Sequence, residues 1–200
     1  MAKRKGRKLP EVLTATEQAA LLAQPNKRYP TGQRNHAMLQ LMLDTGLRVS
    51  EACALRWKDI DVATGQLMVR QGKGSKDRTL WIGDVDLAML QSWRERQARD
   101  VAGSPEHVFT TLDGNPVSPR YVGAMVHRLT ARAGIEKSIH PHTLRHTFAT
   151  DLYRQTKDLL TTAEALGHAS VATTEVYTHL VNDEVRDAMR SFRQPATVAA

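Results

Sequence analysis

Side chains that could act as nucleophiles or transfer protons gather in four short segments of this 200-residue chain. The segments are TGLRVSEACAL at 45–55, GKGSKDR at 72–78, HPHTLRHTFAT at 140–150 and LGHASVATTEVYTH at 166–179. A phenol can attack an electrophile, a guanidinium binds an anion through a planar fork of donors, and lysine or histidine can transfer a proton. Breaking a phosphodiester without a metal needs these three functions, because charge builds up on the phosphorus oxygens and the leaving oxygen needs a proton.

Taken one at a time, the same segments also fit ordinary structural roles. Arg48 could be a surface arginine paired with Glu51, the GKGSK stretch could be a solvated hairpin turn, and Tyr177 could be a core or interface residue. His142 and His146 are spaced i, i+4, as in some zinc sites, but the glutamate of HExxH is absent and no third ligand is evident. We therefore predict no metal site and no cofactor.

The order and spacing of the segments carry more information than any one of them. An arginine in TGLRVSE is followed by a lysine in GKG, an HxLRH motif, an LGH motif, and a tyrosine nine residues after the LGH histidine. With these motifs the chain resembles the catalytic domain of the tyrosine recombinases, the phage-integrase and Xer-type family, from about Leu13 to Arg190. The resemblance implies the fold of that domain and an enzyme that cuts and rejoins DNA.

Carried over to this sequence, the active site of the family consists of six residues, none of which departs from the usual type. They are Arg48, Lys73, His142, Arg145, His168 and Tyr177. The resemblance assigns the catalytic lysine to Lys73, with Lys76 in the same turn as its rival. The remaining histidines are expected to be structural, and His146 in particular to pack or hydrogen-bond inside the fold. They are His36, His107, His127, His140, His146 and His179.

The residue types suit these roles. Arg48 and Arg145 would clamp one phosphate, and Lys73 would protonate the leaving 5′-oxygen. His142 would position or deprotonate the tyrosine, and His168 would hydrogen-bond a non-bridging oxygen.

The implied reaction is site-specific strand exchange. Tyr177 would attack the scissile phosphate and form a 3′-phosphotyrosyl link, and a 5′-hydroxyl of a partner strand would reverse the step without ATP. The resemblance also implies double-stranded DNA as partner, a homotetramer on two DNA sites, a monomer in free solution and DNA-bending accessory proteins. An apolar stripe after the tyrosine could pack on a neighbouring protomer or on its own domain; its residues are Val181, Val185, Ala188 and Met189.

The net charge of +7 is unevenly placed along the chain. Residues 1–8 hold five basic residues and no acid, so the rest carries only +2, with 23 basic against 21 acidic residues. A basic arm and a basic hairpin turn fit a polyanion partner. We predict DNA contacts from both, through Lys3, Arg4, Lys5, Arg7 and Lys8 in the arm and Arg70, Lys76 and Arg78 around the turn.

Several protein classes are excluded by composition. A single cysteine, Cys53, cannot form an intrachain disulfide, which argues against a disulfide-stapled secreted domain. No apolar run approaches the roughly 18 residues of a membrane span, and no apolar segment follows the basic start as in a signal peptide. The expected location is the cytoplasm, at the nucleoid when bound to DNA, with no membrane contact.

The predicted fold is mainly α with a small antiparallel β-sheet, of the α+β class. We expect a helix after the capping box of Thr14 and Glu17, a buried helix over 34–44 ended by Gly46, and a short helix capped by Ser50. Strands are expected at 66–70 and 78–82, joined as a hairpin. A long helix is expected with Asp84 as its N-cap and with Val85, Met89 and Trp93 on one face. Another should start at Ser118-Pro119 and bury its apolar residues, which are Val122, Met125, Val126 and Leu129. Three or four short helices are expected from 141 to about 192.

We expect a flexible arm or linker at 1–12, one catalytic domain at 13–192 and a loose tail at 193–200. Most members of the family carry an additional helical core-binding domain, for which this sequence has no room before residue 13. A naturally short recombinase, a catalytic domain cut from a longer protein and a decayed relic are the alternatives, and the complete set of six residues argues against decay. Rival functions are a type IB topoisomerase-like relaxing enzyme and a DNA-binding accessory protein that does not cut.

Overall fold

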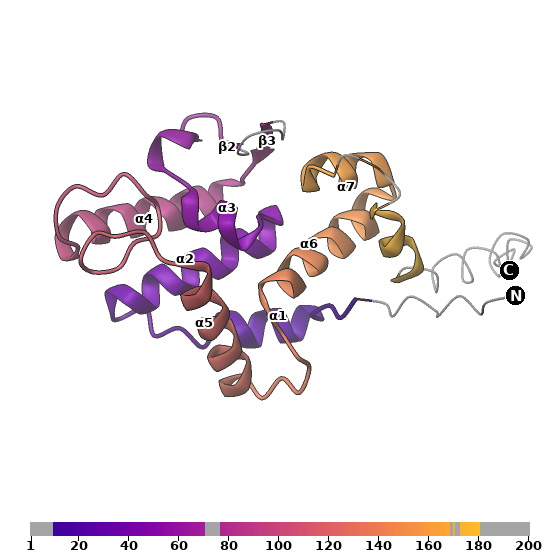
Figure 1. Cartoon of the computed structure of the whole chain (residues 1–200), viewed down its shortest axis with the longest axis horizontal. Coiled ribbons are helices and arrows are strands. Elements are labelled where there is room, and N and C mark those ends of the chain that lie inside the picture. Colours follow the sequence, from indigo (N-terminus) through magenta and orange to yellow (C-terminus); the bar gives the residue numbers. More distant parts are fainter. Residues whose placement is uncertain (1–9, 71–76, 169, 171–172, 181–200) are drawn as a thin grey trace, which may run out of the picture.

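Helices make up most of the chain in the computed structural model, which describes residues 10–70, 77–168, 170 and 173–180 (Figure 1). The helices are α1 (Ala15–Leu22), α2 (Pro30–Thr45), α3 (Val49–Ala54), α4 (Asp84–Asp100), α5 (Pro119–Arg132), α6 (Pro141–Thr156) and α7 (Leu159–Leu166), with 3-10 helices η1 (Trp57–Asp59) and η3 (Glu175–Leu180). The strands are β1 (Ile60–Asp61), β2 (Gln66–Val69) and β3 (Arg78–Trp81). The predicted class, mainly helical with a small antiparallel sheet, is confirmed.

Helix α2 is the central element of the fold. It packs against α4 and α6, which lie to the left and right of it in Figure 1. Its apolar centre is buried on most sides, as predicted, but it begins four residues earlier than expected because Pro30 serves as its first residue. Gly46 ends it with φ +63°, the left-handed conformation predicted for this position. The chain then turns at once into α3.

Helix α3 begins earlier than expected. Arg48, not Ser50, is the N-cap, and the Glu51 carboxylate accepts a hydrogen bond from the Arg48 backbone N–H at 2.8 Å. The prediction was wrong because serine is the usual capping residue, whereas here an acidic side chain three positions into the helix satisfies the free backbone donor. The helix start therefore holds Arg48 and Glu51 against each other.

The sheet has the order β1–β2–β3 and is antiparallel throughout. The hairpin predicted between β2 and β3 is confirmed, with Leu67 paired to Leu80 and Val69 paired to Arg78. The third strand, β1, was not predicted, because two residues are too few to show an alternating pattern. Because side chains alternate along a strand, Leu67, Val69 and Leu80 point into the core while Trp81 faces outward.

Helix α4 starts one residue earlier than predicted, and its buried face includes only part of the predicted apolar stripe. Its N-cap is Gly83 rather than Asp84, and Val85 is 83% exposed. The buried face runs through Asp86, Leu90, Trp93 and Gln97. A strict spacing of four drifts by about 40° per step on a helix of 3.6 residues per turn, so Val85 lies off the buried face, whereas Trp93 is buried and Met89 is half-buried.

The remaining helices follow the sequence pattern more closely. Ser118 caps α5 by accepting a hydrogen bond from the Tyr121 N–H, and the four predicted apolar residues of α5 are all buried; they are Val122, Met125, Val126 and Leu129. From residue 141 the chain forms one long helix, α6, followed by α7 and η3, rather than several short pieces. Residues 181–200, which carry the predicted apolar stripe and the tail, lie outside the described residues.

Within the described ranges, no helix is long and apolar enough to cross a membrane.

An acidic pair joins α2 to α4, and it predicts a pH-dependent loss of stability. Burial, the charge of Asp44 and a hydrogen bond with Asp44 raise the pKa of Asp86 to about 7. The free energy of unfolding should therefore fall as pH rises from about 4 through 7, because ionised Asp86 is favoured only in the unfolded chain. Asp86→Asn should stabilise the protein by roughly 2–4 kcal/mol at pH 8 and by much less at pH 4, measured by urea unfolding.

The matched control is Asp84→Asn, an exposed residue in the same first helical turn. It should lower stability by a few tenths of a kcal/mol at both pH values. Equal effects of Asp86→Asn at pH 4 and pH 8 would contradict the shared-proton pair.

Candidate active site

Five of the six predicted active-site residues line one cavity of about 390 Å³. Arg48 comes from the start of α3, His142 and Arg145 from α6, His168 from the chain after α7, and Tyr177 from η3. The other lining residues are Pro10, His146, Thr173 and Val176. Segments more than 100 residues apart in the sequence thus meet at one place, as the predicted constellation requires.

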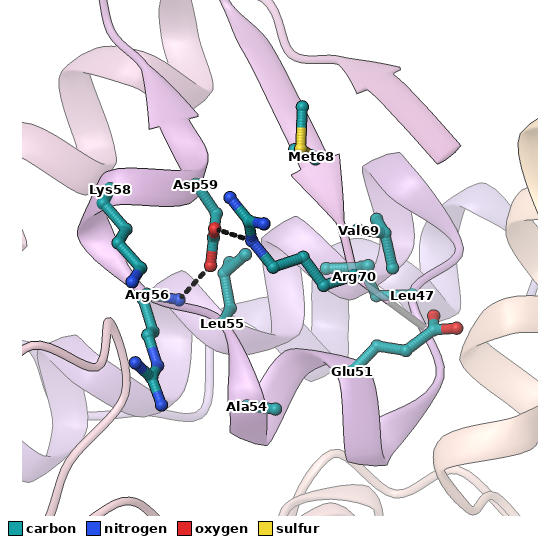
Figure 2. A pocket seen from close by; sticks show the side chains of 10 residues that line it. All are labelled: Leu47, Glu51, Ala54, Leu55, Arg56, Lys58, Asp59, Met68, Val69 and Arg70. Atoms are coloured by element: carbon teal, nitrogen blue, oxygen red, sulfur yellow. Dashed lines mark hydrogen bonds and ion pairs between the residues drawn. The ribbon is translucent and has the colours of Figure 1, made fainter. Parts of the chain in front are cut away.

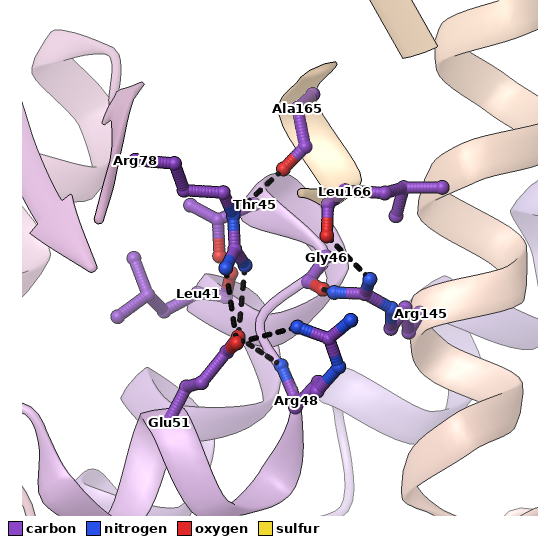
Figure 3. Close-up of polar contacts among 9 residues, drawn as sticks. All are labelled: Leu41, Thr45, Gly46, Arg48, Glu51, Arg78, Arg145, Ala165 and Leu166. Atoms are coloured by element: carbon purple, nitrogen blue, oxygen red, sulfur yellow. Dashed lines mark hydrogen bonds and ion pairs between the residues drawn. The ribbon is translucent and has the colours of Figure 1, made fainter. Parts of the chain in front are cut away.

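Arg145 is buried and ties the C-terminal ends of α2 and α7 to α6. Its Nη1 donates to the Gly46 carbonyl oxygen at 2.6 Å and its Nη2 to the Leu166 carbonyl oxygen at 2.5 Å (Figure 3). Burial, followed by the positive charge of Arg48, lowers the pKa of Arg145 to about 10. The guanidinium therefore stays charged at neutral pH, held by the ends of α2 and α7.

Glu51 is the anion at the centre of a cluster of arginines. Its carboxylate accepts two hydrogen bonds from Arg78, at 2.8 and 2.9 Å, and one from Arg48 Nη1 at 2.8 Å (Figure 3). Burial alone would raise the pKa of Glu51, but the hydrogen bonds from Arg78 and from the Arg48 backbone lower it to about 2. In Figure 3 the guanidinium groups of Arg48 and Arg145 lie next to each other, so Glu51 offsets positive charge that would otherwise separate them.

Arg78 was predicted to contact DNA, and the structure places it elsewhere. Its side chain is only 8% exposed, and it donates to Glu51 and to the Ala165 carbonyl oxygen. It pairs with Val69 on the inner face of the sheet. The alternation of Arg78, Leu80 and Ile82 is the sequence signal for this inward orientation, because residues two apart on a strand share a face.

Tyr177 is 2% exposed and lies against α6. It packs with Ala149 and Leu166, and its hydroxyl oxygen lies 2.8 Å from Nδ1 of His146. Burial raises the pKa of Tyr177, and the charge of Arg145 opposes that effect. The phenol is therefore neutral at physiological pH in the DNA-free protein.

His146 also lines this cavity, although it was not among the six predicted active-site residues. It does form a hydrogen bond inside the fold, as expected, but the partner is the hydroxyl of Tyr177. The available signal was its spacing of four from His142, which places both rings on one face of α6 toward the cavity.

His168 is held by the loop that leads to the tyrosine. Its Nδ1 and the Thr174 hydroxyl lie 2.9 Å apart. Burial, then the charges of Arg145 and Arg48, lowers the pKa of His168 to about 4. The ring is neutral at pH 7 and can use its second nitrogen toward the cavity.

The N-terminal segment also reaches the cavity. The backbone N–H of Leu13 donates to the Thr147 hydroxyl on α6 at 2.9 Å, and Lys137 donates to the Val12 carbonyl oxygen. These bonds hold Pro10 at the cavity wall. The predicted DNA-binding arm, with Lys3, Arg4, Lys5, Arg7 and Lys8, lies outside the described residues but precedes this point directly.

Lys73 and Lys76, the two candidates for the catalytic lysine, also lie outside the described residues, which resume at Asp77. The strand β2 that leads to them ends beside Arg70, which was predicted to bind DNA. Arg70 is 58% exposed, and its Nε donates to Asp59 at 2.7 Å.

A second cavity, of about 440 Å³, lies beside Arg70; Glu51 lines it, but none of the residues that line the first cavity does. Figure 2 shows Arg70 crossing over it toward Asp59, with Arg56 and Lys58 on the same rim. Its apolar lining residues are Leu47, Ala54, Leu55, Met68 and Val69. Arg56, Lys58 and Arg70 make part of this lining basic, while Glu51 and Asp59 add two carboxylates.

Over the parts of the chain that the structure describes, no group of three or more histidine, cysteine or acidic side chains could hold a metal ion. The positive charge at the cavity comes from side chains of the protein, chiefly Arg48 and Arg145.

A family model described as the phage integrase family matches residues 11–184. The tyrosine recombinase XerC of Xanthomonas axonopodis pv. citri is 42% identical over 174 residues, covering 87% of this chain and 55% of the relative. The tyrosine recombinase XerD of Halalkalibacterium halodurans is 38% identical over 192 residues, covering 95% of this chain and 64% of the relative. The chain spans about half the length of the first curated relatives it matches.

Solved structures agree with these relatives. The XerH recombinase bound to a palindromic difH substrate, in a post-cleavage complex, superposes with a TM-score of 0.81 at 28% identity, covering 96% of this chain and 56% of that one. The XerA recombinase superposes with a TM-score of 0.80 at 32% identity, covering 94% of this chain and 67% of that one. The predicted catalytic-domain fold is thereby confirmed.

The Glu51 cluster predicts acid-dependent stability. A carboxyl whose pKa is lowered to about 2 contributes stability that is present above pH 4.5 and lost as pH falls toward 2. Glu51→Gln should cost about 3 kcal/mol at pH 7, and the difference from the unsubstituted protein should shrink between pH 5 and pH 2. Urea unfolding across that pH range measures it.

Glu106→Gln is the control, because Glu106 is exposed and pairs only with the partly exposed Arg56. Its effect should stay within about 0.5 kcal/mol at every pH. If the loss of unfolding free energy in Glu51→Gln did not change with pH, the carboxylate of Glu51 would not be stabilised by the arginines as described.

The turn at Gly46 predicts a second stability difference. An alanine Cβ there would lie 2.2 Å from the ring of Phe148, whereas one at Gly134, which has a similar φ of +68°, would meet nothing within 4 Å. Gly134→Ala should cost only the left-handed backbone strain of about 1 kcal/mol. Gly46→Ala should cost a further ~1–3 kcal/mol because the ring must move, as measured by thermal unfolding. Equal losses in the two variants would show that this turn tolerates a side chain.

Proposed function

The chain belongs to the phage integrase family, and on that premise we propose that it is a site-specific DNA recombinase that cuts and rejoins DNA through a 3′-phosphotyrosyl intermediate. One observation carries the proposal: a tyrosine, two arginines and three histidines from distant segments line a single cavity. The names of the relatives and the XerH complex with its difH substrate support the same reaction class.

In the proposed first step, the Tyr177 oxygen attacks the phosphorus of the scissile phosphodiester. A bond forms between the phenol oxygen and phosphorus, the bond from phosphorus to the 5′-oxygen breaks, and the phenol loses its proton while the 5′-oxygen gains one. The 5′-hydroxyl of a partner strand then attacks the phosphotyrosine and releases Tyr177. The ester keeps the energy of the broken bond, so the exchange needs no ATP.

Arg48 and Arg145 bind the phosphate oxygens and compensate the charge that develops on them. A guanidinium offers five N–H donors in a planar fork, so the two bonds that Arg145 donates to Gly46 and Leu166 leave donors for a phosphate. Those two bonds also orient the fork before DNA arrives. Preorganised donors of this kind lower the barrier because they need no rearrangement in the transition state.

The histidines and the lysine supply the remaining hydrogen bonds and the proton for the leaving oxygen. Neutral His168 donates a hydrogen bond to a non-bridging oxygen, while Thr174 holds its other nitrogen. His142 lines the cavity on the exposed side and contacts the phosphate. Lys73, with Lys76 as its rival, protonates the 5′-oxygen from the hairpin turn that follows β2.

Double-stranded DNA is the proposed partner, bound in the cytoplasm by four protomers on two sites with the help of DNA-bending proteins. The basic arm before Pro10 adds phosphate contacts next to the cavity, and Arg70 adds contacts beside the hairpin.

The proposal predicts a covalent adduct that depends on Tyr177. Duplexes that the protein retains from a random library at low salt are rebuilt as nicked suicide substrates and analysed on denaturing gels. The protein should form an adduct, and Tyr177→Phe should form none, because the attacking oxygen is missing. Tyr153→Phe, which changes a half-buried tyrosine on α6, should form the adduct at the normal rate.

Absence of an adduct on every retained duplex would refute the proposal. Relaxation of a supercoiled plasmid that contains no retained site would instead indicate a relaxing enzyme that uses the same tyrosine.

A further inference from the structure

We propose that His146 is a further catalytic residue, which accepts the phenol proton of Tyr177 during the attack. This inference rests on the proposed function, because it specifies how that reaction begins. It replaces the expectation that His142 deprotonates the tyrosine.

The geometry singles out His146. Its Nδ1 lies 2.8 Å from the Tyr177 hydroxyl oxygen, and the ring centroids are 5.8 Å apart with a 50° angle between the planes. His142 lines the same cavity one helical turn earlier on α6, but it has no hydrogen bond with Tyr177. A general base must be within hydrogen-bond reach of the proton it removes, and His146 meets that condition before DNA is bound.

The protonation states also fit a base. Burial, then the charges of His142, Arg145 and His140, lowers the pKa of His146, so the ring is neutral at physiological pH. A neutral imidazole has one nitrogen without a proton. Among the described residues, Nδ1 of His146 is the one atom that hydrogen-bonds with the hydroxyl, so the phenol proton points to it when Nε2 carries the ring hydrogen.

Entry of a phosphate would strengthen this base. The charged or titratable groups that face His146 are Arg145, His142 and His140 on its own helix, His168 after α7, and Tyr177 on η3. Together with burial, these groups disfavour the protonated form of His146 in the DNA-free protein. An anionic phosphate between Arg48 and Arg145 offsets the positive charge, so His146 becomes a better proton acceptor when substrate is present.

The proton balance of the step is complete with residues of this chain. As the bond between the Tyr177 oxygen and phosphorus forms, the phenol proton moves to Nδ1 of His146. The bond from phosphorus to the 5′-oxygen breaks, and the 5′-oxygen takes a proton from the lysine of the hairpin turn. In the reverse step the imidazolium returns its proton to the departing phenolate.

Two substitutions at this position separate a base from a mere hydrogen-bond partner. His146→Asn places an amide oxygen near the position of Nδ1, which can accept the hydrogen bond but cannot take the proton. His146→Leu removes both functions. Single-turnover cleavage of the suicide substrate should slow by about 10²-fold or more in both variants. His127→Asn is the matched control, because His127 is an exposed histidine on α5 outside the cavity lining, and it should cleave normally.

The pH profile and an NMR measurement give independent readouts. The acidic limb of the cleavage rate should disappear in His146→Asn. In DNA-free protein with ¹⁵N-labelled histidine, Nδ1 of His146 should be unprotonated, and Tyr177→Phe should raise the pKa of His146 because the donated hydrogen bond stabilises the neutral ring. Melting temperatures and gel shifts identify a variant that fails to fold, and the NMR result on the unsubstituted histidine does not depend on any variant.

The inference would be overturned if His146→Asn cleaved at the normal rate, or if His146→Leu cleaved at least as fast as the unsubstituted protein. A proton on Nδ1 of His146 in the DNA-free protein would also overturn it. If His146→Asn keeps the adduct and Tyr177→Phe loses it, only this inference fails. If the unsubstituted protein forms no adduct, the proposed function fails and this inference fails with it.

Discussion

The buried carboxylate of Glu51 is the interaction on which the candidate site depends. Arg48, Arg78 and Arg145 are brought close together, and three guanidinium groups would repel one another without an anion among them. Glu51 supplies that anion and also caps the start of α3, so one side chain sets both the helix boundary and the spacing of the cations. Because Arg78 is anchored on β3, the same carboxylate fixes the sheet to the active-site helices.

Arg145 performs the complementary task on the other side of the cavity. By donating to the Gly46 and Leu166 carbonyl oxygens, it satisfies backbone acceptors at the ends of two helices that would otherwise lack partners. The left-handed turn at Gly46 aims one of these carbonyls at the guanidinium. A residue proposed to bind phosphate therefore also holds the fold together, and in such a site loss of activity on substitution must be separated from loss of structure.

Short motifs with a defined order predicted six active-site residues, five of which line one cavity, and local patterns predicted most helices and the hairpin. The errors have one physical origin, which is that sequence spacing does not reveal what a side chain meets across the fold. Arg78 looked like a surface cation until β3 paired with β2, and Val85 looked apolar and inward but lies off the face through which α4 packs. The hydrogen bond expected for His146 does form, but its partner, Tyr177, is 31 residues away on another element and could not be named from spacing.

The side chains at the cavity fall into two sets, one permanently charged and one neutral. The arginines are permanently positive and offset by Glu51, whereas His146, His168 and Tyr177 are kept neutral by burial and by those same arginines. In the proposed mechanism, Tyr177 therefore still carries its proton and His146 is a neutral imidazole before DNA binds. A phosphate that binds the arginines also changes the protonation of the neutral groups, because its negative charge favours a protonated imidazole beside the tyrosine. Under the proposed mechanism, activation of the nucleophile is then tied to the presence of the bond that it is meant to cut.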